Sequence, residues 1–406
     1  MEQIRPLFIS PLVYNERIVN ARINSALISS LPTYFSPVVL CGDATPFQDC
    51  THILNVKYSL VDKIRLNYLH KVKQKEIHFL PDLYYYYWYK KALRIAEEYI
   101  NKNKIDYIHS FSYPYTSHLV ALELKKKFNI PWIAHFYEPW GDNLFRMINQ
   151  KVITSNITWE NDVANAADLI IHNSETMCDS WRKRYCEIAQ LSKKILYLPM
   201  TFEFKAYPSE ENKLFRRDSK RKLQITHVGN FYGLRKARPF LLAVNELIKE
   251  IPHIKERINI TLVGDVLQED INYAKNHDFL DIIDIVGRKT EEECVSYYQK
   301  SDLFLVIESE QQGSLFFPSK LIQYYYYNRP ILGITTDHSV LFDELKANGH
   351  NAFNPSNTEG IKNYLKIALY NYNSILDYNK DAWKRFDSKN VKNDYLTILN
   401  SVLKII

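Results

Sequence analysis

Glycine is scarce in this sequence, with only 10 glycines among 406 residues. Flexible linkers and low-complexity segments are often rich in glycine, so its scarcity excludes a long disordered linker. Hydrophobic residues make up 46% of the chain and charged residues 24%, which is typical of a globular protein. One hydrophobic core rarely serves a chain of this length, so we expect two domains with a cleft between them.

Cysteine is also scarce, and its spacing matches no metal site. The five cysteines form an odd set without a CxxC pair, which points away from a disulfide framework and from a structural zinc site. No apolar run approaches the ~20 residues that span a bilayer, and residues 1–11 lack the pattern of a signal peptide. We therefore expect a cytoplasmic location, with any membrane contact peripheral.

Positive charge is concentrated in one window. The chain carries a net charge of +6, and residues 57–104 alone hold eleven Lys or Arg against five acids, a difference of +6. One interpretation is a solvated helical face, and the other is a surface for an anionic acceptor or for membrane headgroups. The aromatic run at 84–89 favours the second, because Tyr and Trp suit half-wet interfaces. No nucleic-acid motif accompanies the charge, so nucleic acid is not an expected partner.

Short apolar runs alternate with helix-length segments along nearly the whole chain. Such continuous apolar strands predict parallel sheets covered on both faces, hence an α/β protein with two tandem Rossmann-like, doubly wound domains. The predicted strands are residues 7–9, 38–41, 105–109, 131–136, 168–172 and 195–198 in the first half, and 223–228, 258–263, 282–286, 303–307 and 331–334 in the second.

Four of the ten glycines follow predicted strands of the second half. They are Gly229, Gly264, Gly287 and Gly313. Ligands of open parallel sheets bind beyond the carboxyl ends of the strands, so these loops are expected to face the cleft. Glycine there allows either a tight turn or a close approach of the backbone to a ligand.

The segment 313–332 has the features of an anion site. Pro318 suits the first position of a helix, Ser319 can hydrogen bond at that terminus, and Lys320 adds a positive charge. Unpaired N–H groups at a helix N-terminus favour a bound phosphate. The segment therefore predicts recognition of a phosphorylated ligand, with a nucleoside diphosphate as the best candidate.

Several ordered segments carry a resemblance to a known family. In the second half they read HVGNFYGLRKARPFLLAV, NITLVGDV, IDIVGRKTEEECVSYYQKSDLFLVI and FPSKLIQYYYYNRPILGI, and in the first half IDYIHSFSYPYTSHLVALELKKKFNIPWIAHFYEPW, followed by residues 167–174. Together they resemble family 4 retaining glycosyltransferases of the GT-B fold, of the bacterial surface-polysaccharide type. The resemblance implies an acceptor domain over 1–204, a nucleotide-sugar donor domain over 205–380, and C-terminal helices over 381–406 that pack back on the first domain.

The resemblance also implies a donor site in the second domain. Arg235 takes the place of the family's diphosphate-binding cation and Lys320 is the second candidate. Lys236 and Arg238 are alternatives. In the competing interpretation, the three residues at 235, 236 and 238 lie at the start of a helix and bind no diphosphate. The other implied donor contacts are Gly229, Asn230, Arg288, Gly313, Ser319, Gln323, Glu308 and Glu310.

The family's two glutamates, eight residues apart, correspond here to Leu315 and Gln323. Gln323 can hydrogen bond ribose hydroxyls, whereas Leu315 cannot, so the donor sugar stays open and a deoxygenated or amino sugar is admissible. Glu308 and Glu310 lie just upstream. They either reach the sugar from their loop or are ordinary exposed loop acids.

In the first domain, Glu138 stands where relatives have the Asp of an Asp-Pro-Trp tripeptide. The resemblance gives it a catalytic place, where it orients the acceptor hydroxyl or the donor sugar. His109, His135 and Tyr137 are the implied acceptor contacts, although a histidine near a strand end is more often structural.

These residues predict a glycosyltransferase that needs no cofactor besides its nucleoside-diphosphate sugar. No Asp-x-Asp pair is present, so cations rather than a metal are expected to bind the diphosphate. The acceptor is expected to be a saccharide or a lipid-linked saccharide of surface polysaccharide or lipopolysaccharide synthesis. Two alternatives stay open: a sugar-nucleotide epimerase of the same fold, and a non-catalytic nucleotide-sugar-binding scaffold.

Overall fold

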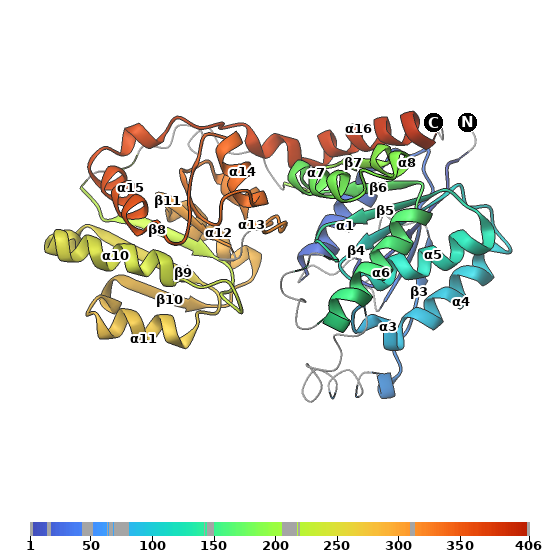
Figure 1. Cartoon of the computed structure of the whole chain (residues 1–406), viewed down its shortest axis with the longest axis horizontal. Helices are drawn as coiled ribbons and strands as arrows, with labels where there is room; N and C mark the ends of the chain where they lie inside the picture. Colours follow the sequence, from blue (N-terminus) through green and yellow to red (C-terminus); the bar gives the residue numbers. More distant parts are fainter. Residues whose placement is uncertain are drawn as a thin grey trace. The chain divides into compact units, whose positions relative to one another are not determined.

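The chain forms two compact units, each built on one parallel β-sheet (Figure 1). The first unit is Met1–Phe204 with Arg385–Ile406, and the second is Lys205–Lys384. This arrangement confirms the predicted α/β class with two parallel sheets. The computed structural model describes residues 3–13, 18–42, 52–62, 64, 68, 81–141, 143, 150–204, 217, 220–308 and 313–403.

The sheet of the first unit has the order β3-β2-β1-β4-β5-β6-β7. Every residue of β1, β2, β4, β5 and β6 is buried, because helices cover both faces of a doubly wound sheet. The strands are β1 (Pro6–Ile9), β2 (Val38–Cys41), β3 (His52–Asn55), β4 (Tyr107–Ser112), β5 (Trp132–Phe136), β6 (Leu169–His172) and β7 (Ile195–Tyr197).

Helices of the first unit form two layers. Helix α5 contacts α4 and α6, whereas α1 contacts α16, so the C-terminal helix belongs to this unit. The helices are α1 (Val19–Ser30), α3 (Tyr84–Tyr87), α4 (Tyr89–Ile100), α5 (Thr116–Phe128), α6 (Gln150–Ala166), α7 (Glu175–Arg184), α8 (Ala189–Lys193) and α16 (Ser388–Ile398). Among the described residues, no helix is both long enough and apolar enough to cross a bilayer.

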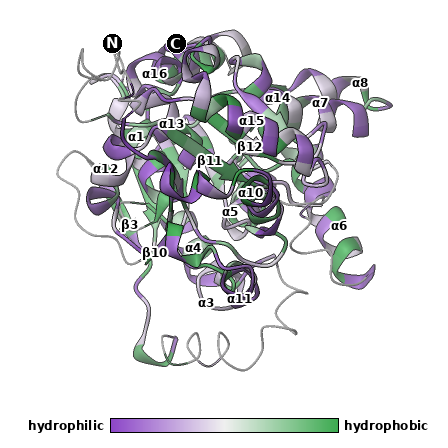
Figure 2. Cartoon of the chain, turned by 90° about the vertical axis from the view of Figure 1, so that its left-hand side faces the viewer, coloured by the Kyte–Doolittle hydropathy of each residue, from purple (hydrophilic) through white to green (hydrophobic). Residues whose placement is uncertain are grey.

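The sheet of the second unit has the order β10-β9-β8-β11-β12-β13. Its core strand β11, which reads LFLVI, is fully buried and green in Figure 2. The strands are β8 (Leu223–Val228), β9 (Ile258–Val263), β10 (Ile283–Gly287), β11 (Leu303–Ile307), β12 (Ile331–Ile334) and β13 (Asn351–Phe353).

Helices again cover this sheet in two groups. Helix α10 packs against α11 and α15, while α12 packs against α13. The helices are α10 (Arg238–Glu250), α11 (Gln268–Asn276), α12 (Glu291–Lys300), α13 (Lys320–Tyr327), α14 (Val340–Ala347) and α15 (Thr358–Tyr370). Helix α13 ends at Asn328, whose φ of 55° is left-handed, and Pro330 then prevents its continuation.

The sequence patterns missed the two edge strands β3 and β13. Strand β3 reads HILN and is only half-buried, while β13 has three residues, so neither presents the apolar run of a covered strand. Strand β4 also runs later than the predicted 105–109. It continues through Ser110, whose hydroxyl accepts a hydrogen bond from Trp132 Nε1 at 2.8 Å, so this polar side chain is satisfied inside the core.

Candidate functional site

The two central strands of the second sheet separate toward their carboxyl ends. Strands β8 and β11 pair only through residues 225–226 and 303–304. Beyond that point Tyr324 of α13 inserts its hydroxyl, which accepts from the Val228 N–H at 2.9 Å and donates to the Leu305 carbonyl at 3.2 Å. This is the reversal point of the strand order, where open α/β sheets bind their ligands.

Lys320 places its ammonium group at this point, directly against Gly229. A β-carbon at Gly229 would collide with Nζ and Cε of Lys320, and the φ of 145° there also favours glycine. The φ of Gly229 therefore favours glycine at this position, and the lack of a side chain lets the cation approach the backbone closely. The structure brings Gly229 and Lys320 together from segments about 90 residues apart.

His227 lies behind this ammonium group. Its Nδ1 is 3.0 Å from the Leu305 carbonyl oxygen, and its Nε2 is 3.4 Å from Lys320 Nζ. A carbonyl oxygen can only accept, so Nδ1 carries the proton and Nε2 accepts from the lysine. His227 thus orients Lys320. The sequence patterns did not predict this role of His227. Its position directly before Val228-Gly229, at the end of a strand, could have indicated it.

Burial controls the charge of both groups. It lowers the pKa of Lys320 to about 7, assisted by the positive charge of Arg235 and opposed by Glu308. Burial, followed by the charge of Lys320, also holds the pKa of His227 well below its usual range. The imidazole is therefore neutral at neutral pH, while the amine is near its titration midpoint and gains a proton readily when an anion binds.

Arg235 forms a two-pronged ion pair with Glu308, which follows β11. Both carboxylate oxygens take part, one with Arg235 Nε and the other with Nη2 at 2.9 Å. The guanidinium carbon also lies 5.1 Å from the ring centre of Tyr232 and 5.8 Å from that of Phe316. Glu308 is only 1% exposed, so the interpretation of Glu308 as an exposed loop acid is wrong.

Three other predicted donor residues hold the neighbouring loops in place. Asn230 Oδ1 accepts from the backbone N–H of Asp265 at 2.9 Å, and the Asp265 carboxylate in turn pairs with Arg288. Lys236 pairs with Glu269 of α11 at 3.0 Å. These contacts link neighbouring loops, and donor binding by the three residues stays a prediction.

Arg238 resembles them, because its Nε lies 3.1 Å from the buried carboxylate of Asp270. The other carboxylate oxygen of Asp270 accepts from the Ala237 N–H at 2.9 Å, at the start of α10. An acid thus offsets the cation at this helix start. For Arg238 the helix-start interpretation fits better than the diphosphate one.

The N-terminus of α13 lies later than predicted. The helix begins at Lys320 and Ser319 is its N-cap, so Pro318 precedes the helix instead of occupying its first position. The Pro318 carbonyl accepts from the Leu321 N–H at 2.9 Å, which closes a turn that a proline can enter. Ser319 makes no side-chain capping bond, so its hydroxyl does not cap the helix.

The remaining predicted donor residues lie on either side of this N-terminus. Gln323 is half-buried on α13, whereas Leu315 is buried in the segment before it. Gly313 is exposed and has a φ of 76°, so glycine suits its backbone conformation. Glu310 lies outside the described residues.

In the first unit, Glu138 is half-buried in a turn directly after β5. The turn is held at three points. The Tyr137 carbonyl accepts from Asn173 Nδ2 at 2.9 Å, the Pro139 carbonyl accepts from the Tyr115 hydroxyl at 2.5 Å, and the Gly141 N–H donates to Glu160 at 2.7 Å. These hydrogen bonds therefore fix the turn that carries the Glu138 carboxylate.

The predicted acceptor contacts His109, His135 and Tyr137 are core residues of the first unit. His109 is fully buried, with Nδ1 2.7 Å from the Tyr395 hydroxyl and Nε2 3.3 Å from His135 Nδ1. Burial lowers the pKa of His135 to about 3 and raises that of Tyr137 well above its usual range. Their burial corrects the expectation that an acceptor touches them, and Tyr395 joins this cluster from α16.

No group of three or more His, Cys, Asp or Glu side chains suited to a metal ion occurs within the described ranges.

Comparisons with known proteins agree with this architecture. Residues 39–189 match the sequence model of Glycosyltransferase Family 4. The chain has the GT-B fold. The match lies within the first unit, where the resemblance also found family 4 segments.

Solved structures resemble this chain over almost its whole length. Sucrose-phosphate synthase from Thermosynechococcus elongatus has a TM-score of 0.67 and 13% identity, with both chains covered completely. Anabaena Alr3699/HepE, in complex with UDP-glucose, has a TM-score of 0.65 and 13% identity, covering 98% of this chain and 100% of the other. An α,α-trehalose-phosphate synthase (UDP-forming) from Burkholderia vietnamiensis has a TM-score of 0.66 and 11% identity, covering 98% and 100%. A search of curated proteins gives no match.

Proposed function

We propose that this protein is a glycosyltransferase, which moves a sugar from a nucleoside-diphosphate donor to a saccharide or lipid-linked saccharide, with retention of the anomeric configuration and without a metal. The observation that carries the proposal is the position of Lys320, whose ammonium group lies against Gly229 at the reversal point of the second sheet. Loop backbone, a helix N-terminus and a cation occur together there. That combination suits a diphosphate.

Lys320 has a clear chemical role in this proposal. Cleavage of the bond between the anomeric carbon and the diphosphate oxygen leaves negative charge on the departing diphosphate, and a nearby ammonium group stabilises that charge. Binding of the diphosphate favours the protonated amine, so the anion itself restores the charge that burial weakens. His227 holds the amine in place through Nε2.

The transfer itself requires no protein nucleophile. The acceptor oxygen forms a bond to the anomeric carbon on the face that the diphosphate leaves, and the hydroxyl proton of the acceptor passes to the departing phosphate. Charge and atoms balance within donor and acceptor alone. In this proposal, Arg235 shares the diphosphate charge, and Glu138 orients the acceptor hydroxyl or the donor sugar.

A similar structure and two side chains near α13 suggest the class of donor. The HepE structure is a complex with UDP-glucose, and that chain is matched over its full length, which supports a UDP-sugar as the first donor to test. In this proposal Gln323, which is half-buried on α13, hydrogen bonds the ribose, while Leu315 offers no hydroxyl contact. We therefore extend the proposal to deoxygenated and amino sugars, with surface polysaccharide or lipopolysaccharide as the product class.

A thermal-unfolding panel followed by a turnover assay tests the proposal. UDP and UDP-sugars are expected to raise the unfolding midpoint, because a ligand at 100 times its Kd adds ~2.7 kcal/mol, whereas uridine without phosphates adds far less. UDP-glucose alone should then give only slow hydrolysis, and release of UDP should rise when saccharide acceptors are added. Conversion of the donor to another sugar nucleotide without acceptor would indicate an epimerase. Binding without turnover across the acceptors would indicate a scaffold.

A further inference from the structure

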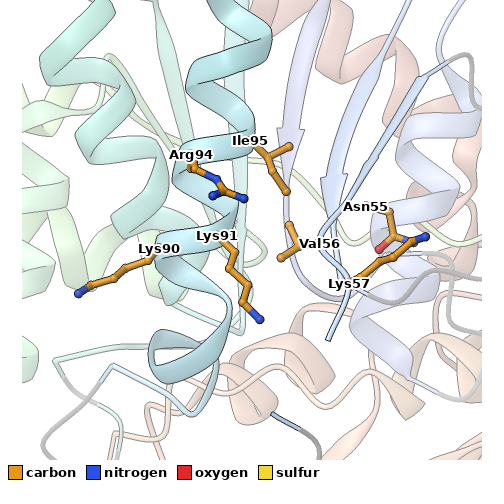
Figure 3. Close-up of a pocket in the computed structure, with 7 residues that line it drawn as sticks. All are labelled: Asn55, Val56, Lys57, Lys90, Lys91, Arg94 and Ile95. Atoms are coloured by element: carbon orange, nitrogen blue, oxygen red, sulfur yellow. The ribbon is translucent and has the colours of Figure 1, made fainter. Parts of the chain in front are cut away.

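A shallow pocket on the first unit is surrounded by cations and is separate from the site described above. It has a volume of about 630 Å³ and lies between α4 and the chain that follows β3. Val56 and Ile95 are its apolar members (Figure 3). Its other lining residues are Asn55, Lys57, Lys90, Lys91 and Arg94.

The cations of this pocket are only partly neutralised. Lys91 Nζ lies 2.5 Å from Asp62, and Arg94 Nε lies 3.7 Å from Glu98 on the exposed face of α4. Within the described ranges, no ion pair joins Lys57 or Lys90 to an acid. The pocket therefore carries a net positive charge.

The ammonium groups do not converge on one point. In Figure 3 the side chains of Lys90, Lys91 and Lys57 end far apart, with Lys90 directed away from Lys57. Side chains that diverge in this way do not converge on one phosphate, which needs ammonium–oxygen distances of about 2.7–3.2 Å. A surface that presents many phosphates can satisfy each cation separately.

Exposed apolar side chains adjoin the same pocket. Leu60, Val61 and Ile64 are 75%, 56% and 60% exposed, and their spacing of i, i+1 and i+4 places them on one face of a helical turn. The turn follows β3 along the chain and appears in blue below α3 in Figure 1. Large aliphatic side chains that are this exposed and this close together mark an interaction surface.

Specific hydrogen bonds hold this turn beside the cations. Ser59 and Asp62 form a capping box, since the Asp62 N–H donates to the Ser59 hydroxyl at 3.1 Å and the Ser59 N–H donates to the Asp62 carboxylate at 2.8 Å. The same carboxylate binds Lys91 of α4. The apolar face and the basic pocket thus form one built surface.

We propose that this surface docks on an anionic lipid bilayer, with Leu60, Val61 and Ile64 entering the headgroup region and with Lys57, Lys90 and Arg94 binding lipid phosphates. Apolar insertion and electrostatic attraction together give stable peripheral binding, as in amphipathic interfacial helices. The proposal goes beyond sugar transfer and does not rest on it. It names the surface on which a lipid-linked acceptor would be met.

Vesicle sedimentation tests the proposal with the full chain and no donor. We expect binding to phosphatidylcholine vesicles that contain phosphatidylglycerol, weaker binding at high salt, and little binding to phosphatidylcholine alone. Replacing Lys57, Lys90 and Arg94 by Ala should weaken binding by roughly fivefold per residue, about 100-fold in total. A matched variant with Lys275, Lys300 and Lys380 changed to Ala has the same net charge and should keep most of the binding.

A separate measurement tests whether the exposed apolar side chains enter the lipid. Leu60→Trp should show quenching by brominated lipids beyond that of the wild-type tryptophans, whereas Leu60→Ser with Ile64→Ser should weaken binding without a change in unfolding temperature, since both side chains are exposed. Equal loss of binding in both triple variants, or no quenching of the new Trp, would overturn the docking surface. Calorimetric binding of inorganic pyrophosphate that the Lys57, Lys90 and Arg94 changes abolish, without vesicle binding, would also overturn it in favour of a soluble anion.

Discussion

Replacing Lys320 by Met should weaken the binding of UDP by about 10- to 150-fold, while it stabilises the unliganded protein. A charged hydrogen bond to a phosphate contributes about 1.5–3 kcal/mol, and this is lost with the amine. Methionine has a similar length and needs no solvation, so removing the buried amine should raise the free energy of unfolding by about 1–2 kcal/mol near neutral pH. Calorimetric titration and chemical denaturation measure the two effects.

The pH dependence follows from the direction of the Lys320 pKa shift. Because its pKa in the folded protein is about 7, below the ordinary 10.5, the unfolded chain binds more protons between these two values, and wild-type stability rises with pH through this window. The advantage of the Met variant should therefore be largest below pH 7 and should disappear toward pH 10.5. UDP affinity of the wild type should fall as pH rises above about 7, because binding then requires uptake of a proton, and the variant should lack this fall.

A suitable control is Lys300→Met, which removes an exposed lysine at the end of α12. It should change neither the UDP affinity nor its pH profile. Wild-type affinity in the Lys320→Met protein, with an unchanged pH profile, would show that the amine does not contact the diphosphate.

Replacing Arg235 by Ala should strongly destabilise the second unit, because Glu308 then stays buried without its two-pronged partner. We expect a loss of about 2–4 kcal/mol in the free energy of unfolding. The double replacement Arg235→Met with Glu308→Gln should restore most of the stability, since no uncompensated charge remains. If Arg235 also contacts the diphosphate, the stable double variant should still bind UDP roughly tenfold more weakly.

Arg238→Ala is the matched control for this experiment. Arg238 also pairs with a buried acid, Asp270, in the same unit, so its loss should destabilise the fold without lowering UDP affinity in the protein that remains folded. Wild-type UDP affinity in the stable double variant would assign Arg235 a purely structural role and leave Lys320 as the diphosphate cation.

The sequence was sufficient to predict the two parallel sheets and the glycine-bearing loops, since continuous apolar runs and helix-length spacers depend only on local pattern. The same pattern could not predict the edge strands β3 and β13, because a half-exposed or three-residue strand has no apolar run. The match of residues 39–189 to family 4 could be anticipated from the order of several short segments.

Side-chain partners in the site were the least predictable part. Arg235 and Glu308 are 73 residues apart, and sequence reasoning assigned them separately to the diphosphate and the sugar, whereas the fold pairs them. The contact of Lys320 with Gly229 depends on where β8 and β11 separate, which no local pattern reveals. The resemblance implied His109 and His135 as acceptor contacts, but the fold buries both, and Tyr395 from the far end of the chain contacts His109.

Hydrogen–deuterium exchange with and without UDP tests the diphosphate site most directly, because it reports which backbone segments the ligand protects. We predict slower exchange in residues 228–236 and 313–324, on both sides of the Lys320 ammonium group, and loss of this protection in the Lys320→Met variant at the same UDP concentration. Protection that is confined to the first unit, or that persists unchanged in the variant, would contradict a diphosphate site at the reversal point of the second sheet.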